Sequence, residues 1–299
     1  MTHFVLFMPK FRLDRSVTLG VHRVSRLLDG CRQLRIPILM YHGIREEVGK
    51  RHPYFETNTS PQLFASHMRL LRDSGYTTVR LSDAVATIAA GRPCRRRVAI
   101  TFDDGYRDFY THAFPILNDY GFKATMFIVS GFTAWRPLRR DEIEYMTWDE
   151  VREIHSYGIE IGSHTVTHPE LQRMSHEQVD YEIRQSKLAI EEEIGQSIRS
   201  FSYPFAFPEP DREFVGVLKG LLEARGYENG VSTVIGTAGR YHDRFFMPRL
   251  PVNSFDDLRF FQAKLEGAYD WLHTAQVFYK RLLKPTVPTS ARSEIAVHS

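Results

Sequence analysis

The stretch Arg-Val-Ala-Ile-Thr-Phe-Asp-Asp-Gly at positions 97–105 decides the fold class. Its first six residues, Arg97–Phe102, are mostly apolar or β-branched and predict a buried strand. The strand runs directly into two carboxylates, Asp103 and Asp104, and a glycine that lets the backbone turn. An isolated Asp-Asp-Gly triplet usually marks only a turn, but a single Asp would serve that purpose. The pair of acids therefore needs a second explanation.

This strand is one of several short apolar runs that alternate with segments of helical periodicity. Such alternation is typical of a parallel sheet covered by helices, and we therefore expect an α/β barrel. A last helix is expected to begin near Ser254. The expected strands are Ile36–Tyr41, Thr77–Leu81, Arg97–Phe102, Ala124–Val129, Glu160–Ser163, Ser200–Tyr203, Val231–Ile235 and Phe246–Leu250.

Capping residues mark where several of the intervening helices begin. Ser60 precedes a proline, Thr147 is followed by Glu150, and Ser175 is followed by Gln178. The last two pairs predict capping boxes, in which two side chains and two backbone N–H groups satisfy one another.

Length and composition limit the class of protein. The chain of 299 residues has a net charge of +3 and only two cysteines, Cys31 and Cys94. Nucleic-acid binding and a disulfide framework are therefore not expected, nor is a signal peptide or a transmembrane segment. We expect an N-terminal extension at 1–35, a main domain at 36–275, and a mobile C-terminal tail at 276–299. The basic extension can pack on the barrel as a helix or act as a surface-associating arm.

A second motif, Ser-His-Thr-Val-Thr-His-Pro at 163–169, also follows a short apolar strand. The spacing of four residues lets the imidazoles of His164 and His168 reach one point, although such pairs also serve as polar groups on surface turns. In a parallel barrel the carboxyl ends of the strands converge on one face. Asp104, His164 and His168 would there form a three-ligand metal site with open positions for water and substrate.

The two motifs, in this order and about sixty residues apart, resemble those of the NodB-type polysaccharide deacetylases of carbohydrate esterase family four. The resemblance covers roughly residues 36–265 and includes Tyr41-His42-Gly43 after the first strand. It implies a distorted, incomplete (β/α) barrel, which has one strand fewer than the eight expected here. It also implies metal-dependent hydrolysis of an N-acetyl group from an amino sugar, oligosaccharide or polysaccharide, with release of acetate.

The resemblance assigns roles to individual residues. Asp104, His164 and His168 would bind a divalent ion, zinc by preference, with cobalt, nickel or manganese as alternatives. The ion would lower the pKa of a bound water, and Asp103 would take its proton as general base. A backbone N–H in the third motif, Ser202-Tyr203-Pro204-Phe205, would stabilise the oxyanion, and Phe205 is the expected donor.

The sequence departs from the family pattern at two places. Ser202 stands where the family has an arginine that orients the catalytic Asp, and Arg249 is our candidate for the missing cation. The family's Leu-x-His motif for the general acid has no clean match, because Leu272 directly precedes His273 and His242 lies in a polar loop. His42 is therefore the candidate acid, with a contact to substrate or to a neighbouring ligand as the alternative.

Three aromatic residues, Tyr41, Tyr106 and Trp148, can either stack on sugar rings or belong to the core. Two other functions remain open at this level: hydrolysis of a non-sugar amide, and carbohydrate binding without catalysis. We expect the substrate to be a carbohydrate that bears N-acetyl groups. We expect a cytoplasmic protein, with the basic extension favouring the inner membrane surface and carrier-linked sugars as substrates.

Overall fold

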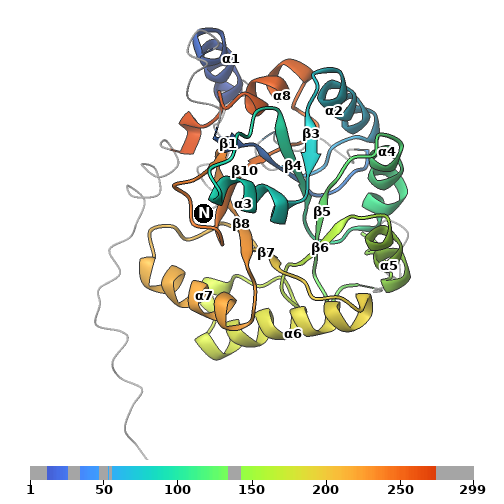
Figure 1. Ribbon diagram of the computed structural model, residues 1–299, viewed down its shortest axis with the longest axis vertical. Coiled ribbons are helices and arrows are strands. Elements are labelled where there is room, and N and C mark those ends of the chain that lie inside the picture. The colour runs from blue at the N-terminus through green and yellow to red at the C-terminus, as the bar shows by residue number, and fades with distance from the viewer. Residues whose placement is uncertain (1–11, 26–33, 47–52, 54–55, 134–142, 274–299) are drawn as a thin grey trace, which may run out of the picture.

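The computed structural model describes residues 12–25, 34–46, 53, 56–133 and 143–273. Its centre is one sheet of parallel strands in the order β2-β10-β8-β7-β6-β5-β4-β3. A further parallel pairing of β2 with β4 closes the sheet into a barrel (Figure 1). The strands are β2 (Ile38–Tyr41), β3 (Thr77–Val79), β4 (Arg97–Phe102), β5 (Thr125–Ile128), β6 (Glu160–Ser163), β7 (Ser200–Ser202), β8 (Asn229–Ile235) and β10 (Met247–Pro251).

Strand β3 lies outside the closed ring. In β4, Ala99 pairs with both β2 and β3, whereas Thr101 pairs with both β2 and β5. Strands β3 and β5 therefore share one edge of β4, and β2 occupies the other. The expected barrel is confirmed, and so is the expectation that one of the eight strands does not belong to its ring. The short strands β1 (Arg35–Ile36) and β9 (Ala238–Gly239) form a separate antiparallel pair.

Helices surround the ring, and α3 lies over its centre in Figure 1. Apolar residues of α3, including Leu81 and Val85, share a buried cluster with Ile38, Ala99 and Val231, which come from three strands of the ring. Helix α3 therefore closes one end of the barrel. The helices are α1 (Leu13–Ser25), α2 (Pro61–Asp73), α3 (Leu81–Ala89), α4 (Phe114–Asp119), α5 (Trp148–Ser156), α6 (His176–Ile194), α7 (Arg212–Ala224) and α8 (Leu258–Leu265), with a π-helical turn η3 (Phe109–Ala113) and a 3-10 turn η4 (Leu171–Arg173).

The expected capping boxes are both present, at Thr147 before α5 and at Ser175 before α6. The expected start of the last helix near Ser254 is wrong, because α8 begins at Leu258. The side chain of Asp257 accepts the N–H of Phe260 and caps the helix. The hydroxyl of Ser254 instead donates to the Asn58 carbonyl and accepts the Ser60 N–H.

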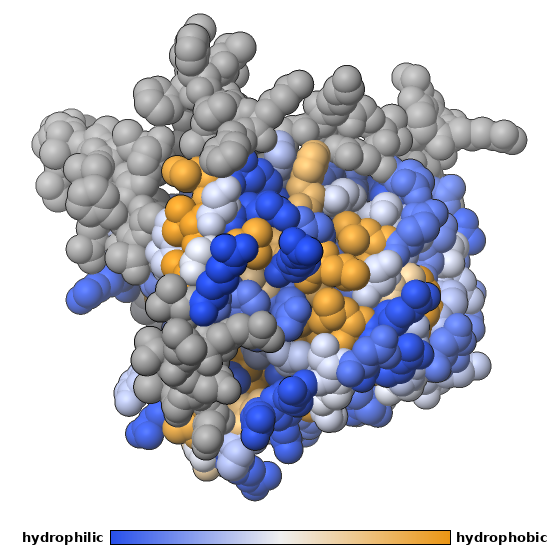
Figure 2. Space-filling model, turned by 90° about the horizontal axis from the view of Figure 1, so that it is seen from above, coloured by the Kyte–Doolittle hydropathy of each residue, from blue (hydrophilic) through white to orange (hydrophobic). Residues whose placement is uncertain are grey.

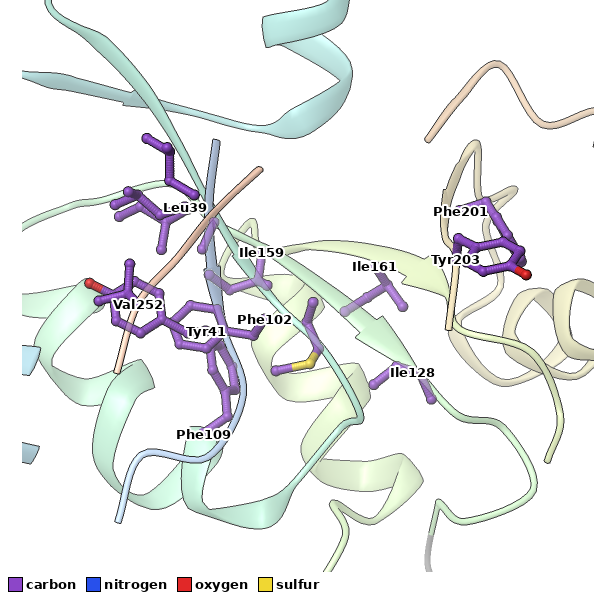
Figure 3. Packing of buried hydrophobic residues seen from close by; sticks show 14 of the residues in the cluster. Leu39, Tyr41, Phe102, Phe109, Ile128, Ile159, Ile161, Phe201, Tyr203 and Val252 are labelled. Atoms are coloured by element: carbon purple, nitrogen blue, oxygen red, sulfur yellow. The ribbon is translucent and has the colours of Figure 1, made fainter. Parts of the chain in front are cut away.

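The main core lies between the barrel and its helices. Alternate residues of β2 and β4 point into it, and Figure 3 shows Tyr41, Phe102 and Phe109 gathered there. The ring centroids of Tyr41 and Phe102 are 5.4 Å apart, and those of Phe102 and Phe109 are 4.7 Å apart. Because side chains alternate along a strand, Thr101 and Asp103 face the opposite side, which is the barrel interior.

Helix α1 packs against α8 and the residues that follow it through polar side chains. Asp14 accepts a hydrogen bond from the Tyr269 hydroxyl, and Thr18 accepts one from the Trp271 indole. The described part of the extension is thus a packed helix. Residues 276–299, expected to form a mobile tail, lie outside the described residues. No helix in the described part of the chain is long and apolar enough to cross a membrane.

Candidate metal centre

The metal-ligand candidates stand at the carboxyl ends of two barrel strands. Asp104 follows β4 and His164 follows β6. Five described non-glycine residues have positive φ, and four of them lie in the motifs expected to form the site. These four are Asp104 (φ 75°), Thr165 (68°), His168 (54°) and Phe205 (56°). Left-handed backbone is unfavourable for such residues, and its concentration here indicates a functional site.

One carboxylate and two imidazoles converge at this end of the barrel. Nε2 of His164 and Nε2 of His168 each lie 3.5 Å from Oδ1 of Asp104. One ligand atom from each of the three residues lies within 4.8 Å of the others, and no other such group occurs among the described residues. Nδ1 of His164 lies 2.8 Å from the Ser202 carbonyl, which leaves Nε2 directed at the site. This donor set fits a divalent ion such as zinc.

The charges within the group influence one another. Burial, together with the neighbouring His164, lowers the pKa of His168 to about 4, although the carboxylates of Asp104 and Asp103 act in the opposite direction. At neutral pH the His168 imidazole is therefore uncharged, which is the form that binds a metal. Burial alone would raise the pKa of Asp104, but the three histidines around it bring the pKa below its usual value. The carboxylate is therefore ionised.

Asp103 is held by the cation that the sequence analysis proposed for it. The guanidinium of Arg249 donates to Oδ1 of Asp103 at 2.8 Å and to Oδ2 at 2.7 Å, and both side chains are buried. Strands β10 and β4 are the two neighbours of β2 in the ring, so their interior side chains can meet. Burial raises the pKa of Asp103, but Arg249 and His164 lower it more, and the result lies below the usual value.

Ser202, the departure from the family pattern, belongs to the same network. Its hydroxyl lies 3.3 Å from Oδ1 of Asp103 and accepts from Arg249 at 3.2 Å. Arg249 also donates to the Thr101 hydroxyl and to the Ser232 carbonyl. Hydrogen bonds to four residues, Asp103 among them, therefore fix the orientation of the guanidinium.

His42 is the candidate acid that the structure brings to the site. It follows β2, and its Nε2 lies 3.9 Å from Oδ2 of Asp103. The two rejected alternatives lie elsewhere: His242 contacts the backbone of Gly239, and His273 pairs with Glu209 at 3.0 Å.

A family model described as polysaccharide deacetylase matches residues 90–217. The chain is also 33% identical over 220 residues to YxkH of Bacillus subtilis, which is named as a polysaccharide deacetylase, and the match covers 73% of this chain and 72% of that protein. The chain belongs to the polysaccharide deacetylase family. The resemblance inferred from the two motifs is thereby confirmed.

One further relative and one solved structure are similar to the chain. The poly-β-1,6-N-acetyl-D-glucosamine N-deacetylase of Escherichia coli K12 is 31% identical over an alignment of 138 residues, and the match covers 42% of this chain and 20% of that protein. The structure of the Streptococcus pyogenes deacetylase PplD, determined with acetate, matches with a TM-score of 0.68 and 24% identity over 78% of this chain and 99% of that chain. The structural likeness supports the barrel fold.

Two of the expected substrate residues border the metal-ligand group of this deacetylase. The ring of Phe205 is half-exposed, and its centroid lies 4.5 Å from that of His168. Tyr106 is half-buried beside Asp104, and burial together with the Asp104 carboxylate raises the pKa of its hydroxyl. The Arg45 guanidinium lies 4.8 Å from the Tyr106 ring centroid.

The other aromatic candidates belong to the core. Tyr203 is 2% exposed and packs edge-on against Phe207, so its side chain belongs to the core. Figure 3 shows it among the buried residues. Although the motif that contains Tyr203 is expected to stabilise the oxyanion, the Tyr203 side chain itself therefore has a packing role. Tyr41 is fully buried, and Trp148 packs against the core cluster.

Sequence reasoning missed Glu182, whose carboxylate contacts the loop between the two histidines. Glu182 lies within a helix, where a glutamate is ordinary, so nothing in its local pattern marks it. Thr101 was also missed, although its position two residues before Asp103 on a strand predicts that both face the interior.

Proposed function

We propose that this protein is a metal-dependent carbohydrate N-deacetylase that hydrolyses an N-acetyl group and releases acetate. The observation that carries the proposal is a three-ligand group directly beside a buried carboxylate that is paired with a buried arginine. Two carboxylates adjacent in the chain thus have different environments, one among imidazoles and one against a guanidinium. Such a division of roles is typical of hydrolytic sites.

The ligand group Asp104, His164 and His168 would hold the ion, which when bound supplies a Lewis acid that polarises the amide carbonyl and makes water a stronger acid. Asp103 accepts the proton of the attacking water, because Arg249 keeps its carboxylate ionised and oriented. The backbone N–H of Phe205 stabilises the oxyanion, and the contact of the Phe205 ring with His168 supports its place beside the ligand group. Tyr106, which contacts Asp104, would bind the substrate beside the ligand group.

His42 has one of two roles in this proposal. As general acid it gives a proton to the leaving amine, and its Nε2 lies close enough to Asp103 to share the reaction centre. As a substrate contact it only binds the sugar. The variant His42→Gln separates the two roles: loss of the acid lowers kcat and removes the basic limb of the pH–rate profile, whereas loss of a contact raises KM alone.

The substrate is a hexosamine derivative that is free, lipid-linked or polymeric. The E. coli relative acts, by its name, on a polymer of N-acetylglucosamine, which supports an amino-sugar substrate here. The test is a screen of acetate release from N-acetylhexosamine oligomers and from nucleotide- or lipid-linked sugars, with Asp103→Asn as the inactive control. Release from non-sugar amides only, or sugar binding without any release, would favour one of the two alternative functions.

We also propose that α1 contacts an anionic membrane surface and brings the enzyme to carrier-linked sugars in the cytoplasm. The inward side chains of α1 are polar, whereas Leu13, Val17 and Val21, spaced by four residues, are exposed. The face on the side of α1 and α8 carries several hydrophobic residues (Figure 2). A helix that turns its apolar side outward beside basic residues is suited to a membrane interface. Cell fractionation tests the location, and protein found mainly outside the cytoplasm contradicts the proposal. Flotation on anionic vesicles tests the membrane contact, and a Val17→Ser variant that floats as the wild type does also contradicts it.

A further inference from the structure

The loop between the two histidine ligands is held from both sides. On one side, the N–H groups of Ser130 and Gly131, just after β5, donate to the carbonyls of Thr165 and Val166 at 3.1 and 2.9 Å. Gly131 lies so close that an added Cβ would be 2.6 Å from the Val166 carbonyl oxygen. The carbonyls of the loop are thus satisfied by the neighbouring strand end.

On the other side, one carboxylate satisfies the N–H groups of the loop. Oε2 of Glu182 accepts the N–H of Val166 at 2.8 Å and that of Thr167 at 2.9 Å. Oε1 accepts the Thr167 hydroxyl at 2.7 Å. Hydrogen bonds to an ionised acceptor are stronger than those between neutral groups.

Glu182 is buried, with 4% of its surface exposed, and in the described part of the chain its hydrogen bonds go to Val166 and Thr167 rather than to a basic side chain. A buried carboxylate without a cation needs its hydrogen bonds to offset the loss of water. The loop therefore supplies the hydrogen bonds that stabilise the buried Glu182 carboxylate, and Glu182 supplies the acceptors for the N–H groups of the loop.

The loop includes two of the strained residues, Thr165 and His168, which both have positive φ. Strained backbone persists only where the surrounding contacts impose it. The residues between them, Val166 and Thr167, are those that Glu182 contacts. Glu182 thus holds the residues that directly precede His168, whose Nε2 lies 3.5 Å from Oδ1 of Asp104.

We propose that Glu182 is a positioning residue that sets His168 in its ligand position before the ion binds. The proposal rests on the proposed metal-dependent function and names the part of the fold that pre-organises its site. Loss of a group that orients a ligand typically weakens metal affinity by about 10- to 100-fold. The effect acts through the apo protein, so it is measured as zinc affinity and not only as activity.

The test compares three variants of the full chain by competition titration with zinc. Glu182→Ala removes the acceptors, and we expect zinc to bind about 10- to 100-fold more weakly. Glu182→Gln keeps an oxygen for the two N–H groups and an amide that can donate to Thr167, so we expect it to restore most of the affinity. Glu192→Ala, an exposed glutamate on the same helix, is the matched control and should bind zinc as the wild type does.

Two further measurements separate positioning from general damage. In the apo protein, Glu182→Ala should lose hydrogen-exchange protection at Val166 and Thr167 while the barrel strands keep theirs. At saturating zinc the variant should recover most of its kcat. Zinc affinity equal to that of Glu192→Ala would overturn the proposal, and equal weakness of Glu182→Gln and Glu182→Ala would show a charge effect and overturn it too. Wild-type protein that binds no divalent ion would overturn the proposed function itself.

Discussion

The two halves of the site are assembled in different ways. The metal-ligand half comes from two short motifs, Asp104 and His164 to His168, in which each residue is recognisable from its immediate neighbours. The half that holds the proposed base joins Asp103 to Arg249, which are 146 residues apart in the chain. Local motifs therefore supply the candidate ligands, whereas the pairing of β2 with both β10 and β4 brings the cation to Asp103. Variants in the two halves should fail in different ways.

The largest effect is expected from the ligands. We expect one divalent ion per chain, with loss of both the ion and activity in His164→Ala and His168→Ala, because two protein ligands hold such an ion far less tightly than three. Elemental analysis of protein purified without added metal is the measurement. Full occupancy in both variants would show that the ligands are assigned wrongly.

Asp103→Asn should remove the proposed general base and leave the metal ligands in place. The amide keeps the shape of the side chain but cannot accept the proton of water, so we expect kcat to fall by roughly 10²- to 10⁴-fold with the metal retained. Asp104→Asn serves as the comparison, because it should weaken metal binding as well. Exchanged phenotypes would mean that the roles of the two carboxylates are reversed.

Arg249→Met should lower the rate and change its pH dependence. Arg249 lowers the pKa of Asp103, so its loss raises that pKa, the base becomes protonated at higher pH, and the acidic limb of the pH–rate profile moves upward. The fold should also lose about 3–5 kcal/mol of stability, since the variant leaves a buried carboxylate unpaired. Arg249→Lys, which keeps the charge without the fork, is the control; an unchanged profile in Arg249→Met would remove the residue from the mechanism.

Ser202→Ala should have the smallest effect. Its hydroxyl makes two long contacts, to Asp103 and to Arg249, while the guanidinium keeps its bidentate bond to the carboxylate. We expect a loss of about 1 kcal/mol, or roughly fivefold in kcat/KM, with an unchanged metal content. A loss as large as that of Arg249→Met would show that Ser202, and not Arg249 alone, replaces the arginine of the family motif.

Most of the fold was predictable from local patterns. All eight expected strands are present with ends within about two residues, and both capping boxes form. The start of α8 was misplaced, because a serine can cap a helix or bind a distant backbone, and only the contacts to Asn58 and Ser60 decide between these. Within the site, Arg249 was a hypothesis whose alternative was a surface pair, and its burial against Asp103 depends on the closed ring.

By itself the sequence determined the barrel, the family and the motifs that hold the candidate site residues, because alternation of strands and helices and the spacing of candidate ligands are properties of neighbours in the chain. Only the tertiary structure decided that β3 lies outside the ring, that the Tyr203 side chain is buried and that Asp103 pairs with Arg249. The same is true of the hydrogen bonds of Glu182 to the loop between His164 and His168. Each of these depends on which distant segments meet. Strand register and helix packing determine which distant segments come into contact, and no local pattern of residues specifies these contacts.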